Sequence, residues 1–335
     1  MKNVNTHEYE FKLFREMTPT LRYDGKEDFA EWQKRARAKL TELLGLPLTP
    51  GTHGLEIEYK TDGEGYTEYR FTVETEPGYY VPAHLRIPTG VDGPIPLTIC
   101  ASGHGGGMHV ALGVAKCEKD EEALRSWPHR NMAARAIKEG RAALVFENRS
   151  FGECSLEGYG TSCTEAAKIA ILMGRTVLGE RVWDAMRLLD EVEKNFPNID
   201  MTNIVCTGNS GGGTVTYYLA CLDERITAAA PSCSVCNFDE SIAAKRHCMC
   251  NYVPGIRKYF EMGDLGGLIA PRKLVIAAGE QDPGFFIKGT REAFDEIKRV
   301  YTAAGVPENC ALEVAVGGHL NYADHLWSRL HKMGI

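Results

Sequence analysis

The pentapeptide Gly208-Asn209-Ser210-Gly211-Gly212 has the Gly-x-Ser-x-Gly spacing typical of a nucleophilic serine. An apolar run ends just before it, at Cys206 or Thr207, and a helix-like segment follows, so Ser210 is expected on a tight strand-to-helix turn. The glycines at positions 208 and 212 allow the two elements to approach closely, while the strained turn exposes the serine hydroxyl. The helix N-terminus favours negative charge at the same place. The alternative is a glycine-rich turn with an incidental serine, and the flanking pattern favours the nucleophile.

An aspartate and a histidine follow two later apolar runs and could activate this serine. Asp282 lies in the segment 279–284, and His319 lies in the segment 317–321. If both runs are parallel strands, these residues lie at the same sheet edge as the serine. We therefore predict that His319 accepts the serine proton and that Asp282 orients the imidazole and stabilises its cationic form. Glu280 and Asp239 are the alternative acids.

Acyl transfer also needs two backbone N–H groups that bind the oxyanion, each of which typically lowers the barrier by ~3 kcal/mol. The N–H of Gly211, next to the nucleophile, is expected to supply one. The second is expected from the loop Ser102-Gly-His-Gly-Gly-Gly107, where we choose the amide of His104, with Gly105 as the alternative. The simpler interpretation of this loop is a flexible glycine turn.

The elements that must position these groups alternate between apolar runs and helix-like segments, which indicates an α/β fold with a mostly parallel central sheet and helices on both faces. The expected strands are 95–101, 142–146, 204–206, 226–230, 274–278 and 312–316. The expected helices are 120–139, 179–195, 212–222, 290–304 and 321–333. Glu147 and Arg149 follow one of the strands, and we favour a structural ion pair between them over contact with substrate.

The first part of the chain has a different pattern. Residues 29–44 place apolar side chains at helical spacing before Gly45 and Pro47, which predicts a helix laid on the main body or on a second copy of the chain in a homo-oligomer. Between residues 55 and 88 the period is close to two, which predicts an antiparallel ribbon of about three strands. We therefore expect an N-terminal helical extension over 1–50 and one catalytic α/β domain over 51–335, with lid-like insertions at about 150–178 and 233–265.

From about Val81 onward the chain resembles the acetyl xylan esterase and dienelactone-hydrolase-like branch of the α/β-hydrolase superfamily. The motifs that carry the resemblance are Gly103-His-Gly-Gly-Gly107, Thr207-Gly-Asn-Ser-Gly-Gly-Gly213, His247-Cys-Met-Cys-Asn-Tyr-Val-Pro-Gly255, Met262-Gly-Asp-Leu-Gly-Gly-Leu268, Gly279-Glu-Gln-Asp-Pro283 and Gly317-Gly-His319. The resemblance implies a carboxylic ester hydrolase that needs no cofactor and uses Ser210, Asp282 and His319. Dienelactone hydrolases use a cysteine nucleophile, from which Ser210 departs.

The expected reaction is removal of acetyl groups from small sugars or glycosides, so the expected partner is a small-molecule ester. A lactone or xenobiotic carboxylesterase is the alternative. A peptidase is less favoured, because the residues before the sheet cannot build the propeller domain of related oligopeptidases. A non-catalytic binding protein would have no need of all three catalytic residue types.

Two cysteine pairs, Cys233-x-x-Cys236 and Cys248-x-Cys250, lie near His247 and could suggest zinc. Because their spacing is not that of common zinc knuckles, we expect no metal and instead buried thiols that shape the pocket wall. Tyr252 and Phe285 are further candidates for that wall.

Composition limits the partners and the compartment. The formal net charge is −7 and no Lys/Arg-rich run stands out, which argues against nucleic acid. No segment is long and apolar enough to span a bilayer, and the N-terminus lacks the apolar core of a signal peptide. Eleven cysteines fit reduced thiols better than a disulfide framework. We therefore expect a cytoplasmic protein.

Overall fold

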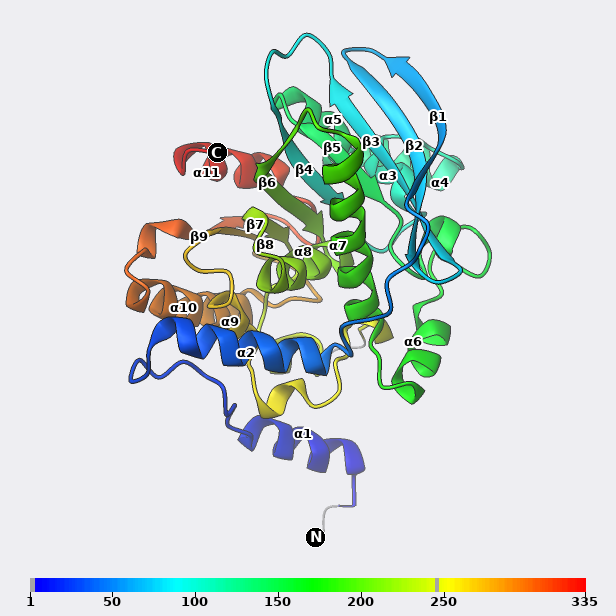
Figure 1. Ribbon diagram of the computed structural model, residues 1–335. Coiled ribbons are helices and arrows are strands. Elements are labelled where there is room, and N and C mark those ends of the chain that lie inside the picture. Colours follow the sequence, from blue (N-terminus) through cyan, green and yellow to red (C-terminus); the bar gives the residue numbers. More distant parts are fainter. Residues whose placement is uncertain (1–3, 245–246) are drawn as a thin grey trace.

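The computed structural model describes residues 4–244 and 247–335, and its centre is one nine-stranded sheet (Figure 1). Residues 1–3 of the predicted extension and residues 245–246 of the second predicted insertion lie outside the described residues. The strands are β1 (Leu55–Gly63), β2 (Tyr66–Glu76), β3 (Tyr79–Pro88), β4 (Ile95–Ala101), β5 (Ala142–Phe146), β6 (Ile199–Asn209), β7 (Ile226–Ser232), β8 (Lys273–Gly279) and β9 (Cys310–Ala315).

The sheet has the order β1-β2-β3-β5-β4-β6-β7-β8-β9. The strands β1, β2, β3 and β5 pair in antiparallel fashion, and every pair from β5 through β4 to β9 is parallel. This confirms the predicted ribbon and the mostly parallel sheet. Because β4, β6, β7, β8 and β9 run in the same direction, the loops that follow them meet at one sheet edge.

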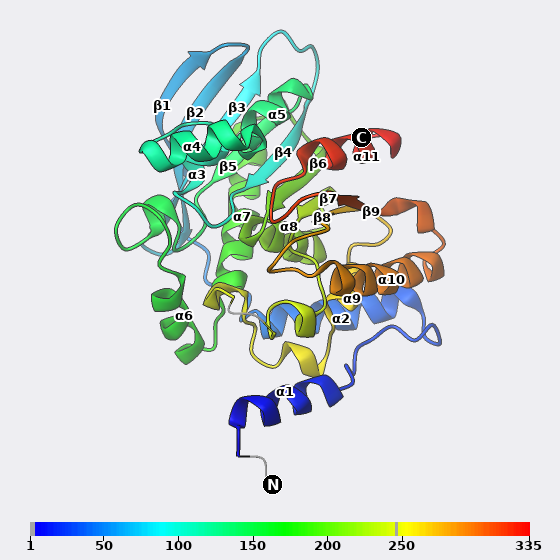
Figure 2. The ribbon, with the colours of Figure 1, turned by 180° about the vertical axis from the view of Figure 1, so that it is seen from behind.

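Helices cover both faces of the sheet (Figures 1 and 2). Strand residues alternate between the two layers: Ile99 and Ala101 belong to the larger core, whereas Cys100 packs with α3 and α5 on the opposite face. The α-helices are α1 (Thr6–Glu16), α2 (Phe29–Leu43), α3 (Met108–Ala111), α4 (Glu118–Ser126), α5 (Met132–Lys138), α6 (Cys163–Leu172), α7 (Val177–Asn195), α8 (Gly211–Leu222), α9 (Met262–Gly266), α10 (Ile287–Ala303) and α11 (Ala323–Lys332).

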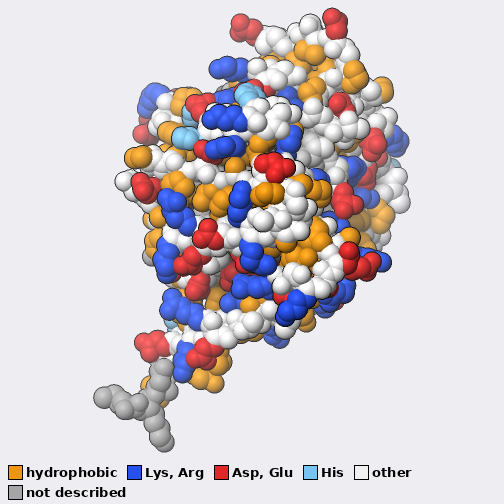
Figure 3. All heavy atoms as spheres, turned by 90° about the vertical axis from the view of Figure 1, so that its left-hand side faces the viewer, with side chains coloured by type: hydrophobic (Ala, Val, Ile, Leu, Met, Phe, Trp, Pro, Cys, Tyr) orange, Lys and Arg blue, Asp and Glu red, His pale blue; other side chains and the backbone are white. Residues whose placement is uncertain are grey.

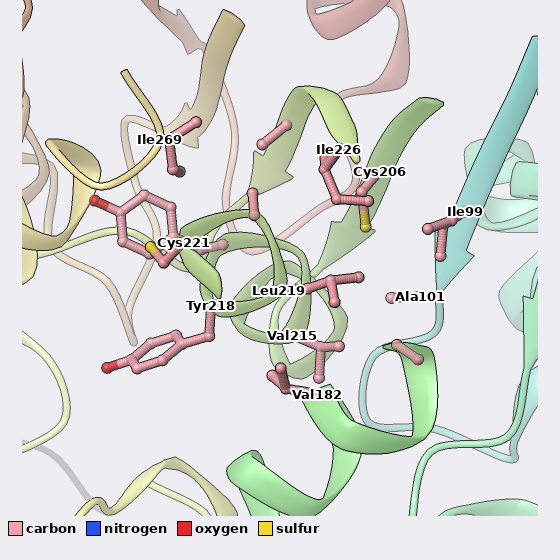
Figure 4. Close-up of a cluster of buried hydrophobic side chains, with 14 of the residues drawn as sticks. Ile99, Ala101, Val182, Cys206, Val215, Tyr218, Leu219, Cys221, Ile226 and Ile269 are labelled. Atoms are coloured by element: carbon pink, nitrogen blue, oxygen red, sulfur yellow. The ribbon is translucent and has the colours of Figure 1, made fainter. Parts of the chain in front are cut away.

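The helix that follows Ser210, α8, is enclosed on nearly all sides. Figure 4 shows Val215 and Leu219 of α8 between Val182 of α7 and the sheet residues Ile99 and Cys206. All five of these side chains have no exposed surface. Such complete burial fixes the helix, and with it the position of the serine at its N-terminus.

The predicted N-terminal helix is present as α2, whose Trp32, Ala36 and Leu40 are fully buried. The Trp32 indole donates a 2.9 Å hydrogen bond to the Leu21 carbonyl oxygen. The helix packs on the main body of its own chain, against α8. A further helix, α1, lies within the predicted helical extension but was not predicted as a separate element, and none of its residues is buried.

The expected helix over 120–139 is wrong as one element. The chain forms α4, then a 3₁₀ turn over Pro128–Arg130, then α5. Pro128 lacks an N–H and disfavours helical geometry in the residue before it. Trp127 accordingly adopts an extended φ of −144° and ψ of 82°. The side chain of Asn131 then caps α5 by accepting a hydrogen bond from the Ala134 N–H.

Lys and Arg side chains are interspersed with Asp and Glu on the face shown in Figure 3. This face therefore presents no field of a single sign. Within the described part of the chain, no helix has the length and apolar character needed to cross a membrane.

Candidate active site

The turn that carries Ser210 has the geometry predicted from its sequence. Ser210 lies between the last residue of β6 and the first of α8, with φ of 56° and ψ of −122°. A positive φ strains any residue other than glycine, and here it places the side chain at the sheet edge. A Cβ on Gly208 would lie 2.5 Å from the backbone of Gly212, and one on Gly212 would lie 2.0 Å from the carbonyl oxygen of Ala101. Both glycines are therefore required by the close packing of β6, α8 and β4.

Asp282 and His319 form a close pair at the same edge. His319 Nδ1 lies 2.7 Å from Asp282 Oδ2. The other carboxylate oxygen, Oδ1, accepts hydrogen bonds from the N–H groups of Gly284 at 2.8 Å and Phe285 at 3.1 Å. The Asp282 side chain is 1% exposed, whereas that of His319 is 32% exposed. The buried Asp282 carboxylate thus orients the His319 imidazole, which remains accessible to solvent and to a substrate.

The electrostatics of Asp282 suit an ionised acid. Burial opposes its charge, but the hydrogen bond and charge of His319 together with the Gly284 and Phe285 N–H groups outweigh burial and hold the pKa of Asp282 below its ordinary value. Among the described residues neither alternative acid pairs with His319: Asp239 pairs with Arg15 at 3.7 Å, and Glu280 is exposed.

Ser232, at the end of β7, connects the serine turn to the histidine loop. Its carbonyl oxygen accepts a 2.9 Å hydrogen bond from the Ser210 N–H. Its hydroxyl donates to the Leu320 carbonyl oxygen at 2.9 Å and accepts from the Tyr322 N–H at 3.2 Å. Ser232 was not predicted, because nothing in its local sequence marks this position.

Within residues 4–244 and 247–335, no hydrogen bond joins Ser210 Oγ to His319. Hydrogen bonds between a nucleophile and its base are often long without substrate and shorten in the complex. The structure therefore brings the acid and base into contact, and brings the serine to the same edge through Ser232.

The Ser102–Gly107 loop approaches Ser210 closely. A Cβ on Gly103 would lie 2.5 Å from the Asn209 carbonyl oxygen and 3.5 Å from the Ser210 Cβ. The N–H groups of His104, Gly105 and Gly211 have no acceptor among the described residues. The Asn148 amide donates a 2.9 Å hydrogen bond to the Ser102 carbonyl oxygen and fixes the start of the loop. The loop thus offers free backbone donors beside the serine.

A small cavity of about 50 Å³ lies along this loop. Val110, Ala111 and Met132 supply apolar walls. Four buried polar atoms with no hydrogen-bond partner among the described residues belong to its lining: Ser102 Oγ, Arg130 Nε, Asn209 Oδ1 and Asn321 Oδ1. Unpaired buried polar atoms are rare and often mark a place where a ligand or water binds.

The two predicted wall residues lie in different places. The Phe285 ring stacks on His319, with centroids 5.7 Å apart and planes at 11°. Tyr252 lines a separate cavity of about 450 Å³ between α1 and the segment 238–258, and its hydroxyl donates to the Ile242 carbonyl oxygen at 3.0 Å. Of the two predicted wall residues, only Phe285 therefore lies against Asp282 and His319.

The expected ion pair between Glu147 and Arg149 is wrong. Arg149 donates two hydrogen bonds of 2.7 Å to Asp184 and also pairs with Glu76 at 2.7 Å. The Glu147 carboxylate instead accepts hydrogen bonds from the backbone N–H groups of Met108, at 3.0 Å, and Glu153, at 3.2 Å. In a strand, two residues at positions i and i+2 would point to the same face. Glu147 and Arg149 lie just beyond the end of β5, so this alternation does not apply to them. Burial raises the pKa of Glu147 to about 7.

The two cysteine pairs considered for zinc are not brought together. Cys233 lies with Asp282 and His319, and Cys236 donates to the Phe286 carbonyl oxygen at 3.4 Å. Cys248 and Cys250 belong to a different group, which includes His104 and Cys163. All eleven cysteines are free thiols.

The strand order, the strained serine turn and the loops at one sheet edge define an α/β-hydrolase. A model of the Abhydrolase family matches residues 3–316, and the chain belongs to this family of hydrolases.

Known proteins agree with this assignment. The chain is 24% identical over 245 residues to the "Putative hydrolase YtaP" of Bacillus subtilis, covering 72% of this chain and 79% of that protein. It is similar in structure to a putative acetyl xylan esterase from Bacteroides fragilis, with a TM-score of 0.83, 18% identity, and coverage of 99% and 96% of the two chains. A glucuronoyl esterase from Solibacter usitatus superimposes with a TM-score of 0.69 at 16% identity, over 94% of this chain and 96% of its own.

Proposed function

We propose that the protein is a serine carboxylic ester hydrolase. Ser210 attacks the ester carbonyl, His319 accepts its proton and then donates it to the leaving alcohol, and Asp282 holds the imidazole. His319 then accepts a proton from a water molecule that attacks the acyl-serine, which releases the acid and returns the proton to Ser210. The 2.7 Å contact between Asp282 and His319, at the sheet edge that also carries the strained Ser210, is the observation that supports this proposal best.

The oxyanion formed in this reaction binds to backbone donors. Gly211 supplies one N–H, and His104 supplies the other, with Gly105 as the alternative. These groups have no acceptor among the described residues, which supports the assignment. Donors that are fixed before the reaction stabilise the developing charge without reorganisation in the transition state.

The preferred substrates are acetyl esters of small sugars or glycosides. The cavity of about 50 Å³ beside the loop has room for an acyl group of a few non-hydrogen atoms, and Val110, Ala111 and Met132 suit a methyl group. Each methylene that does not fit costs on the order of 1–3 kcal/mol in selectivity. The structural similarity to a protein described as an acetyl xylan esterase is in line with this choice.

A second candidate is hydrolysis of esters of sugar acids. One similar structure is a glucuronoyl esterase, and Arg130 brings an unpaired guanidinium nitrogen to the cavity, where it suits an acidic or strongly polar group. The two candidates differ in the acid released: the first releases acetate, and the second releases a sugar acid.

A kcat/KM series over acetyl, butyryl and octanoyl esters of p-nitrophenol tests the acyl preference. We expect a steep fall along the series and acetate release from acetylated xylo-oligosaccharides. Ser210→Ala is the blank and should lose about 10⁴-fold or more in rate while remaining folded. Near wild-type rates in this variant would remove Ser210 as the nucleophile. A flat profile without acetate release would contradict the deacetylase assignment and leave a general carboxylesterase, and release of a sugar acid from its methyl ester would favour the second candidate.

A further inference from the structure

Four side chains of metal-binding type meet behind the Ser102–Gly107 loop. His104 comes from this loop, Cys163 begins α6, and Cys248 and Cys250 come from the segment that includes the short 3₁₀ helix Met249–Asn251. One ligand atom from each, an imidazole nitrogen or a thiol sulfur, lies within 4.8 Å of all the others. We call these residues the Cys3His cluster. Three cysteines and one histidine are a common ligand set of structural zinc sites.

The distances fit the dimensions of a tetrahedral zinc site. With Zn–S bonds of ~2.3 Å and a Zn–N bond of ~2.0 Å, adjacent ligand atoms are separated by about 3.5 Å for S···N and about 3.8 Å for S···S. His104 Nε2 lies 3.4 Å from the sulfur of Cys250 and 3.8 Å from that of Cys163. The remaining separations between the ligand atoms are all within 4.8 Å.

A buried cation beside the cluster provides an independent argument. Arg181 on α7 is 1% exposed, and its guanidinium donates to the Arg149 carbonyl oxygen at 3.0 and 2.6 Å and to Cys163 Sγ at 3.3 Å. No carboxylate among the described residues pairs with it. A buried charge without a counter-charge is strongly destabilising. Three thiolates and one Zn²⁺ carry a single net negative charge, which would balance this guanidinium.

We propose that the Cys3His cluster binds one zinc ion. Its four protein ligands fill the coordination sphere, so the ion has a structural role and activates no water. The N–H···S contact from Arg181 orients Cys163 and stabilises its thiolate, as outer groups do at other zinc sites. This ligand set differs from the sequence-based alternative, which combined Cys233 and Cys236 with Cys248 and Cys250.

The zinc would join three segments of the chain: the Ser102–Gly107 loop, the start of α6 and the segment around the 3₁₀ helix Met249–Asn251. The cluster lies where the two insertions meet, next to a small apolar core of Phe151, Cys163, Ala167, Ala170, Val177 and Cys250. It also fixes the side chain of the residue proposed to bind the oxyanion. The His104 ring packs so closely on Gly211 that a Cβ there would lie 2.8 Å from His104 Cε1 and Nδ1. Zinc would thus hold the backbone of His104 at a set position beside the nucleophile.

The test is the zinc content of the full chain, purified without metal-affinity chromatography and measured by inductively coupled plasma mass spectrometry. We expect about one zinc ion per chain in the wild type and at least about tenfold less in Cys250→Ser. Cys236→Ser is the matched control, because it removes another buried thiol that only the sequence-based ligand set includes. It should retain zinc at the wild-type level.

X-ray absorption at the zinc edge of the wild-type protein gives a result that does not depend on how the variants fold. We expect three sulfur ligands at about 2.3 Å and one nitrogen ligand at about 2.0 Å. The proposal is overturned if the folded wild type, expressed with added zinc, contains less than about a tenth of an equivalent. It is also overturned if Cys236→Ser loses zinc to the same extent as Cys250→Ser, or if mass spectrometry of freshly purified protein finds a disulfide within the cluster.

Discussion

The Ser232 hydroxyl donates a 2.9 Å hydrogen bond to the carbonyl oxygen of Leu320, the residue that follows His319. Because the Ser232 carbonyl oxygen accepts from the Ser210 N–H, one buried residue sets the separation of the serine turn and the histidine loop. The two proposed catalytic residues are thus positioned by a residue that takes no part in the chemistry.

Replacing Ser232 by alanine should lower kcat more than it changes KM. The variant leaves the Leu320 carbonyl and the Tyr322 N–H without their partner, which costs about 1–3 kcal/mol of stability. Displacement of the histidine loop should reduce kcat by roughly ten- to a hundredfold. Steady-state kinetics beside thermal unfolding measure both effects, with Ser328→Ala on the exposed side of α11 as control. An unchanged kcat in a destabilised variant would show that Ser232 has only a structural role.

Asp282→Asn should reduce kcat/KM by about 10³- to 10⁴-fold without unfolding the protein. Asparagine can still accept from the Gly284 and Phe285 N–H groups, but it no longer stabilises the imidazolium or selects the correct tautomer. Hydrolysis of p-nitrophenyl acetate measures the loss. Asp239→Asn, which changes the alternative acid on the surface, should retain activity. If Asp239→Asn is the impaired variant, the acid is misassigned.

Glu147→Gln should change how stability depends on pH. Burial raises the pKa of Glu147 to about 7 from its ordinary value of 4.5, so between these pH values the folded protein holds a proton that the unfolded chain has lost. The free energy of unfolding of the wild type therefore falls as pH rises through this window, and glutamine removes this contribution.

We compare the free energy of unfolding of the wild type with that of Glu147→Gln at each pH. The difference, wild type minus variant, should fall by up to about 3 kcal/mol between pH 5 and 7. Urea unfolding at several pH values measures this difference. Glu165→Gln, exposed on α6, should give a constant difference. A difference for Glu147→Gln that rises with pH would show that hydrogen bonds from Met108 and Glu153 dominate over burial.

Gly212→Ala should destabilise the fold by about 3 kcal/mol or more, since the new methyl group would lie 2.0 Å from the Ala101 carbonyl oxygen, which cannot move without displacing β4. Gly140→Ala is the matched control. Its φ is 69° and no atom lies within 4 Å of the added Cβ, so only backbone strain of about 1–2 kcal/mol is expected. Similar losses in the two variants, measured by chemical denaturation, would contradict the packing argument.

Much of the fold could be predicted from local sequence. Buried strands and covering helices differ in hydrophobic period, so the local sequence indicates both the sheet and α2. The break between α4 and α5 was equally readable, because Pro128 lies in the middle of the expected helix. The segments on both sides of that proline have helical periodicity, which by itself favours one continuous helix.

The candidate site was predictable only where a residue sits in a local motif. The glycines around Ser210 and the strand ends before Asp282 and His319 are visible in the sequence. Ser232 and the Arg149–Asp184 pair depend on contacts between distant segments, for which a single sequence contains no signal. The same holds for the Cys3His cluster, since Cys163 is far from Cys248 along the chain and no spacing rule connects them.

The edge strand β1 affects whether the sheets of two molecules can pair with each other. Among the described residues it pairs only with β2, so its other edge presents backbone groups that have no strand partner and could recruit a further strand. Charged side chains at Glu56, Glu58, Lys60 and Asp62 and a bulge between Ile57 and Tyr59 interrupt this edge. Extension of the sheet from one molecule into the next is therefore disfavoured, which protects a protein with a long β-ribbon from aggregation.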